Sequence, residues 1–150
     1  MPAVKLKTEQ QYNASAAELW QIIHDPGTMP AYNAKCVSSE SLARFETGQT
    51  FAVKYEMNGK MTDAVGELVG YETESMVHFR YTYEDGTAVG NVDEIFQIIP
   101  SGERRCRVVH ILDLSNSTLP RWAKIVVGFI SRFGKSQGGG PLDGIAELLE

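Results

Sequence analysis

Six strand-like segments separated by short turns occupy the middle of the chain and constrain its fold more than any other feature. They span residues 36–41, 50–57, 60–71, 76–83, 88–99 and 104–114. Asn58-Gly59 is typical of a two-residue hairpin turn, and the links 84–87 and 100–103 have the length and residue types of hairpin loops. Connections this short join antiparallel neighbours, because a parallel pair needs a crossover of about a dozen residues. The pattern therefore predicts an antiparallel meander.

A strand and a helix precede this meander. Residues 4–12 alternate in polarity with a period of two, which is typical of a half-buried strand. At Ser15 the period becomes helical, because Ser15 can cap a helix and Glu18 stands three residues later as its capping-box partner. This helix should end at Asp25-Pro26-Gly27, where proline and glycine favour a turn.

The last third of the chain returns to a helical period. Its apolar residues recur every three or four positions along one face: Leu119, Trp122, Val126, Phe129 and Phe133. This long helix should end at the glycine run 138–140, after which Pro141 permits a short final helix that contains Ile145 and Leu149. The order of elements predicts an α+β fold in which a curved sheet buries its apolar face against the long helix.

Composition limits the class of protein and its partners. With 150 residues, of which 43% are hydrophobic and 22% charged, the chain has the size and composition of a single globular domain, 1–150. A net charge of −5 argues against nucleic-acid binding, which depends on Lys and Arg side chains that neutralise phosphates. The N-terminus lacks an apolar signal segment, and no window is apolar enough to span a membrane. We therefore expect a cytoplasmic protein, a monomer or a homodimer, with reduced thiols at Cys36 and Cys106.

The sequence offers no support for a metal or nucleotide site. His24, His78 and His110 are far apart and do not have the spacing of metal ligands. The run Gly138-Gly-Gly140 lacks the Lys-Ser/Thr pair of a phosphate-binding loop and does not follow a predicted strand. The sequence also contains no Gly-x-Ser-x-Gly motif that would mark a nucleophilic serine. We expect no metal and no dedicated cofactor.

A histidine and a carboxylate are candidates for acid-base chemistry. His110 shares the apolar face of its predicted strand, and a bulge in the preceding turn would decide whether Asp93 or Glu94 lies opposite it, because a one-residue slip exchanges the faces. Glu94 is the expected inward carboxylate, since it alternates with apolar residues. A buried Glu–His pair could move protons near neutral pH, or it could only form an internal hydrogen bond. His78 and Arg80 are expected on the outward face, with His78 solvated.

The predicted inward faces carry aromatic side chains that could fill a core or line a cavity. The candidate lining residues are Phe51, Tyr55, Phe79, Tyr81, Phe96 and His110 on strands, and Trp122, Val126 and Phe129 on the long helix. A cavity with such walls would suit a flat hydrophobic ligand, because a few polar groups among apolar ones fix its orientation.

The beginning of the chain resembles that of the START-like (SRPBCC) superfamily. The matching residues are Tyr12-Asn-Ala-Ser-Ala-Ala-Glu-Leu-Trp, then Asp25-Pro26, then Met29-Pro-Ala-Tyr32. The match is closest to the polyketide cyclase/dehydrase branch, and the order of elements agrees over nearly the whole chain. The resemblance implies a helix-grip fold, in which a seven-stranded antiparallel sheet wraps around a long C-terminal helix with an elongated cavity between them. Two features depart from the family pattern: Tyr32 stands where tryptophan is usual, and the glycine run 138–140 interrupts the last helix.

These observations lead to three functional expectations. The first is reversible binding of a small hydrophobic or aromatic ligand, similar to a lipid, quinone or polyketide, between the sheet and the C-terminal helix. The second is an enzyme of the polyketide cyclase/dehydrase kind, in which Glu94 and His110 move protons and Tyr81 holds an enolate oxygen. The third is an interaction module whose basic last helix docks on a partner protein or a membrane surface through Arg121, Lys124, Arg132 and Lys135.

Overall fold

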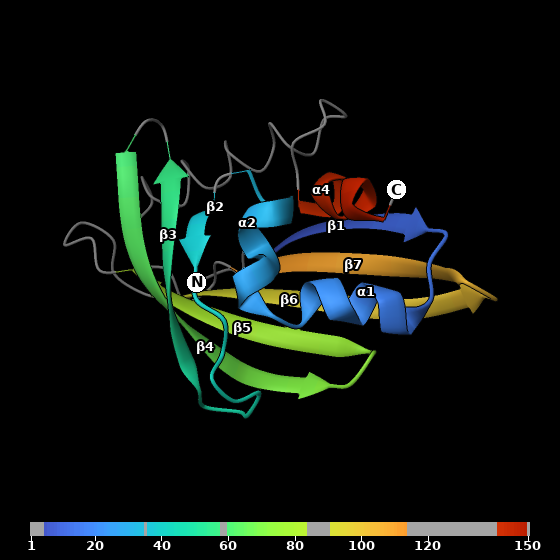
Figure 1. Cartoon of the computed structure of the whole chain (residues 1–150), viewed down its shortest axis with the longest axis horizontal. Coiled ribbons are helices and arrows are strands. Elements are labelled where there is room, and N and C mark those ends of the chain that lie inside the picture. The colour runs from blue at the N-terminus through green and yellow to red at the C-terminus, as the bar shows by residue number, and fades with distance from the viewer. Residues whose placement is uncertain (1–4, 35, 58–59, 84–90, 114–140, 150) are drawn as a thin grey trace.

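The computed structural model describes residues 5–34, 36–57, 60–83, 91–113 and 141–149, and its centre is one antiparallel sheet (Figure 1). The strands are β1 (Lys5–Tyr12), β2 (Cys36–Ser39), β3 (Thr50–Met57), β4 (Lys60–Glu72), β5 (Met76–Tyr83), β6 (Asn91–Gly102) and β7 (Arg105–Asp113). The helices are α1 (Ala16–Ile23), the 3-10 helix η1 (Pro26–Thr28), α2 (Met29–Tyr32) and α4 (Pro141–Leu148). The strand order β1-β7-β6-β5-β4-β3-β2 is a meander from β2 to β7, which β1 extends at the far edge by pairing with β7.

The strands expected from the sequence are confirmed, with changes at their ends. β2 stops at Ser39, two residues early. β6 continues to Gly102 because the turn into β7 contains only Glu103 and Arg104, and the backbone φ of Arg104 is 48°, in the left-handed region. Asn58-Gly59 lies outside the described residues, but Met57 pairs with Lys60 on either side of it, as a hairpin requires.

The helix between β1 and β2 begins and ends where the sequence indicated. The Ser15 hydroxyl accepts a hydrogen bond from the Glu18 backbone N–H at 3.1 Å, and the Glu18 carboxylate accepts one from the Ser15 N–H at 3.3 Å, which completes the capping box. The helix ends at Ile23, and the Asp25 side chain then caps η1 by accepting a hydrogen bond from the Gly27 N–H at 2.9 Å. This chain of caps places α1 and α2 against the sheet.

The helices cover one face of the sheet, and the core lies between them and that face (Figure 1). The buried side chains on the strands include Phe51, Val53, Tyr55, Ala64, Leu68, Val77, Phe79, Tyr81, Phe96, Ile98, Cys106 and Val108. Those from the helices are Leu19, Trp20, Ile23, Met29, Tyr32, Leu142 and Ile145. The predicted long helix over 119–133 lies outside the described residues, whereas the short final helix is confirmed as α4.

Two close contacts fix α4 against the rest of the core. The buried hydroxyl of Tyr12 on β1 donates a hydrogen bond to the Leu142 carbonyl oxygen at 2.6 Å. Burial raises the pKa of Tyr12 above its usual value, so the hydroxyl stays protonated and remains a donor. Gly144 packs directly on the backbone of α2, because a Cβ at Gly144 would overlap the carbonyl oxygen of Tyr32. α4 therefore holds the backbone of Tyr32 in place through this contact.

Both cysteines are free thiols with buried side chains, as expected. Burial, and to a smaller extent the charge of Glu94, raise the pKa of Cys36 to about 12. The thiol is therefore neutral at physiological pH and a poor nucleophile.

Gly66 on β4 allows an aromatic layer to form on the inner face. Gly66 lies opposite Phe51 on β3 and opposite Tyr81 on β5, and the ring of Phe51 occupies the space where a Cβ of residue 66 would stand. Phe51 in turn packs edge-on against Phe79 and Tyr81, with ring centroids 5.6 and 6.0 Å apart. The missing side chain at residue 66 is thus a requirement of the core.

We predict that Gly66→Ala destabilises the protein by about 1–3 kcal/mol, because the added methyl group forces the Phe51 ring out of its place. The matched control is Gly70→Ala on the same strand, where no atom lies within 4 Å of the added Cβ. Urea unfolding of the two variants and the wild type measures the difference. Equal stability of Gly66→Ala and Gly70→Ala would contradict this description of the aromatic layer.

Candidate functional site

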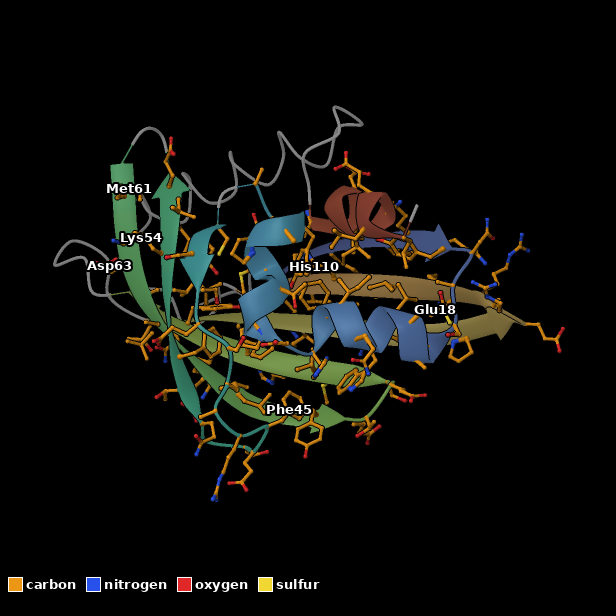
Figure 2. The ribbon with its side chains drawn as sticks, in the orientation of Figure 1. Glu18, Phe45, Lys54, Met61, Asp63 and His110 are labelled. Carbon is orange, nitrogen blue, oxygen red and sulfur yellow. The ribbon has the colours of Figure 1, made fainter. Side chains whose placement is uncertain are left out.

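Three buried polar side chains from adjacent strands meet on the inner face of the sheet. The Tyr81 hydroxyl on β5 donates a hydrogen bond to Glu94 Oε1 on β6 at 2.8 Å, and His110 Nε2 on β7 lies 2.9 Å from Glu94 Oε2. The three residues are 2%, 5% and 5% exposed, respectively. Figure 2 shows His110 on the side of the sheet where α1 and α2 lie. We call these residues the Tyr–Glu–His network.

The register between β6 and β7 brings Glu94 and His110 to the same face. His110 lies directly opposite Phe96, and Glu94 lies opposite Leu112, so Glu94 reaches His110 along the diagonal. A register shift between Pro100 and Gly102 sets this alignment. The carboxylate expected to face inward is therefore Glu94, although neither it nor Asp93 lies directly opposite His110.

Asp93 faces the other side of the sheet and forms an ion pair there. Its two oxygens accept hydrogen bonds from Arg80 Nε at 2.9 Å and Nη2 at 3.2 Å. His78 Nε2 lies 3.1 Å from Asp93 Oδ2, but its N–H is not aligned for a hydrogen bond. His78 and Arg80 are outward as predicted, but the expectation that His78 is solvated is wrong: its side chain is only 21% exposed because it packs beside Asp93.

The hydrogen bonds of the network fix which groups donate. Burial, followed by the negative charge of Glu94, raises the pKa of Tyr81 well above its usual value, so the phenol keeps its proton. An ionised carboxylate only accepts hydrogen bonds, so His110 Nε2 carries the hydrogen when Glu94 is charged. The ring of His110 packs against that of Phe96 at a centroid distance of 4.6 Å, which fixes its plane. Each carboxylate oxygen thus has one donor and can accept another.

Aromatic side chains surround this network. The predicted lining residues on the strands, Phe51, Tyr55, Phe79, Tyr81, Phe96 and His110, are all buried on the inner face. The ring of Tyr55 packs edge-on against Tyr81 at 6.0 Å, and its hydroxyl lies 3.4 Å from the sulfur of Met29. The predicted lining residues Trp122, Val126 and Phe129 lie outside the described residues. The described side chains around the network are therefore mostly aromatic.

Tyr32 also lies at this site, although its role could not be predicted from the sequence. Tyr32 is 4% exposed, its ring packs edge-on against Phe96 at 6.2 Å, and the charge of Glu94 contributes to raising its pKa. Its hydroxyl has no hydrogen-bond partner among the described residues. α2 has only four residues, too few for a period that would show which of its side chains face inward. The only signal was the departure from the usual tryptophan.

A separate aromatic cluster lies at the C-terminal end of α1. Phe45, which is labelled in Figure 2, lies in the loop before β3. Its ring packs against Tyr71 at 4.4 Å and against Trp20 at 5.9 Å, and His24 stacks on Trp20 at 5.6 Å. Tyr71 is 37% exposed. This cluster attaches the loop to α1 and contains none of the predicted site residues.

A groove of about 360 Å³ lies over strands β2 to β4. The groove is lined by Lys54 and Asp63, which form an exposed ion pair at 3.8 Å. In Figure 2 both residues lie at the opposite side of the molecule from Glu18, with His110 between them. The groove contains none of the predicted site residues.

In the part of the chain that the structure describes, no group of three or more His, Cys, Asp or Glu side chains is placed to hold a metal ion. None of the described helices is long and apolar enough to cross a membrane.

Comparisons with known proteins agree with this fold. Residues 3–150 match the family model described as polyketide cyclase / dehydrase and lipid transport. A START superfamily protein from Mycobacterium smegmatis is 18% identical, with a TM-score of 0.71 over 97% of this chain and 99% of that one. The Zhui aromatase/cyclase from Streptomyces sp. R1128 is 11% identical, with a TM-score of 0.75 over 97% and 93% of the two chains. Norcoclaurine synthase from Thalictrum flavum, in truncated form, is 15% identical, with a TM-score of 0.71 over 99% and 94%.

These structural similarities, all at low sequence identity, concern the fold, whereas the family model matches the sequence itself. A sequence comparison with curated proteins gives no match. The curled seven-stranded antiparallel sheet, covered on one face by helices, is that of the helix-grip fold. The chain therefore belongs to the polyketide cyclase/dehydrase and lipid transport family, and its fold is that of the START-like (SRPBCC) superfamily.

Proposed function

We propose that the protein binds a small hydrophobic or aromatic ligand against the inner face of the sheet, with a polar group of the ligand at the Tyr–Glu–His network. The observation that carries this proposal is a connected, buried network of three polar side chains within aromatic walls. The family description, which includes lipid transport, supports a ligand of low polarity.

The energetic cost of burying Glu94 favours a role beyond packing. A carboxyl group removed from water costs several kcal/mol unless it is paired, and apolar residues of the same volume would fill the space without this cost. Here the described partners of Glu94 are a phenol and an imidazole, and no Lys or Arg side chain lies against it among the described residues. A strong acceptor therefore remains in an apolar environment, which is the arrangement that orients a polar group on a hydrophobic ligand.

The packing of the inner-face rings supports a planar ligand. Phe51 packs edge-on against Phe79 and Tyr81, and Tyr55 packs edge-on against Tyr81. Rings arranged in this way present flat faces and edges that complement another planar ring. A planar aromatic ligand with a hydroxyl group matches both features, since its ring contacts the walls and its O–H donates to Glu94.

A second candidate function is catalysis of the polyketide cyclase/dehydrase kind. The specific observation in its favour is that Tyr81 and His110 contact different oxygens of the same carboxylate. In such a reaction Glu94 and His110 would remove and return a proton, while the Tyr81 hydroxyl would turn its single hydrogen from Glu94 to the enolate oxygen that forms. The third expectation, docking through the basic residues 121–135, concerns a segment outside the described residues and stays a prediction.

We predict that the protein purified from its expression host carries a small apolar molecule. Native mass spectrometry would then detect a species heavier than the chain by the mass of one ligand, and denaturing extraction would release it. If the protein is empty, a thermal-shift screen of hydrophobic compounds should find stabilising ligands, because a ligand that binds the folded state raises the melting temperature. An empty protein together with a flat screen would contradict the proposed function.

Replacement of Glu94 tests the role of the carboxylate in ligand binding. We predict that Glu94→Gln weakens binding of 2-naphthol by about 10- to 100-fold, which is the value of a hydrogen bond to a charged group, and leaves binding of naphthalene unchanged. Titration followed by fluorescence measures both affinities. The matched control is Glu9→Gln, an exposed residue on β1. An equal loss for both probes would indicate a purely structural role, and the proposal would fail at this residue.

A further inference from the structure

Tyr32 on α2 has a buried hydroxyl that the fold does not use. The side chain is 4% exposed, and the hydroxyl has no hydrogen-bond partner among the described residues. Two other buried side-chain atoms lack a partner in the described part of the chain, Ser39 Oγ and His78 Nε2, but both residues are only half-buried. His78 also lies 3.1 Å from the Asp93 carboxylate. Tyr32 therefore stands apart, because a fully buried polar group normally has a partner.

The hydroxyl of Tyr32 lies close to the Tyr–Glu–His network and is a donor. Burial, followed by the charge of Glu94, raises the pKa of Tyr32 well above its usual value, so the phenol is protonated. The ring of Tyr32 packs against Phe96 at 6.2 Å, and Phe96 packs against His110 at 4.6 Å, so Tyr32 lies beside the network. The described donors to Glu94 are Tyr81 and His110, and the Tyr32 hydroxyl is bonded to neither carboxylate oxygen. The hydrogen of Tyr32 is thus available to a group that enters from outside.

The position of Tyr32 is fixed by contacts on both sides. Its ring packs at 90° against Phe96, which also contacts His110. Its backbone is held by α4, because Gly144 packs directly on the Tyr32 carbonyl group, and by the hydrogen bond from the Asn33 N–H to the Met29 carbonyl at 2.8 Å. A donor that is held in place before binding loses little conformational freedom when a ligand arrives.

We propose that the Tyr32 hydroxyl donates a hydrogen bond to a carbonyl oxygen of the ligand, and that Tyr32 thereby makes the site selective for aromatic ketones and quinones. This inference rests on the proposed ligand-binding function and adds a second polar contact to it. Glu94 accepts a hydrogen bond from a hydroxyl group of the ligand, whereas Tyr32 donates a hydrogen bond to a carbonyl oxygen of the ligand. Together they recognise a planar molecule that carries both a hydroxyl and a carbonyl group.

The test compares two planar probes of similar shape, 9-fluorenone and fluorene. They differ at one ring position, where 9-fluorenone has a carbonyl group and fluorene has a methylene group. Their dissociation constants are measured by fluorescence titration for the wild type, Tyr32→Phe and the control Tyr71→Phe, whose tyrosine belongs to the separate cluster with Phe45. We expect the wild type and Tyr71→Phe to bind 9-fluorenone about five- to tenfold more tightly than fluorene, the value of one neutral hydrogen bond. Tyr32→Phe should lose this preference and bind fluorene as the wild type does.

The melting temperature of the ligand-free variants gives a second measurement. Tyr32→Phe removes a donor that has no partner, so its melting temperature should equal or exceed that of the wild type. A fall of several degrees would show that the hydroxyl has a structural partner, and would overturn the inference even if the variant bound no probe.

The remaining outcomes separate this inference from the proposed function. If the wild type binds neither probe, the inference is overturned, whereas the proposed function fails only if the protein is also empty and the thermal-shift screen is flat. If the wild type and Tyr32→Phe bind both probes with equal affinity, the ligand site exists but Tyr32 does not select a carbonyl group. An equal loss of affinity for both probes in Tyr32→Phe would assign the residue to packing and overturn the inference in the same way.

Discussion

The register between β6 and β7 determines which side chains reach the interior of this protein. The shift between Pro100 and Gly102, together with the left-handed backbone of Arg104, aligns His110 with Phe96 and leaves Glu94 on the same face. A slip of β7 by one residue against β6 would turn His110 outward, away from Glu94, because side chains alternate between the two faces of a strand. The Tyr–Glu–His network, and the functions proposed for it, depend on this alignment.

The two neighbouring carboxylates of β6, Asp93 and Glu94, have different hydrogen-bond partners on the two faces of the sheet. Asp93 faces outward and forms a two-point ion pair with the Arg80 guanidinium. Glu94 faces inward, where its described partners are a phenol and an imidazole and the surrounding side chains are aromatic. A guanidinium group satisfies a carboxylate through two parallel hydrogen bonds, whereas a phenol and an imidazole leave it able to accept another donor. This difference explains why we place the ligand at Glu94 and not at Asp93.

Much of this arrangement could be predicted from the sequence because it depends on local signals. Turn residues and alternation defined the strands, the capping box of Ser15 and Glu18 defined α1, and alternation alone placed Glu94 and His110 inward. The direct partner of His110 could not be predicted, since it depends on the bulge at Pro100. The close contacts of Gly66 with Phe51 and of Gly144 with Tyr32 were also beyond sequence reasoning, because each joins segments that only tertiary structure brings together. Tyr32 was missed as a site residue for the same reason.

The three histidines of the chain allow one direct test of the binding site. His110 belongs to the network, His78 lies on the outward face beside Asp93, and His24 stacks on Trp20 at the end of α1. Two-dimensional NMR of the ¹⁵N-labelled imidazole rings during titration with 2-naphthol reports on all three positions at once. If the ligand binds at the Tyr–Glu–His network, the His110 resonances should show saturable shifts, and those of His78 and His24 should not change. Shifts confined to His78 or His24, or no shift at His110 while 2-naphthol binds, would contradict it.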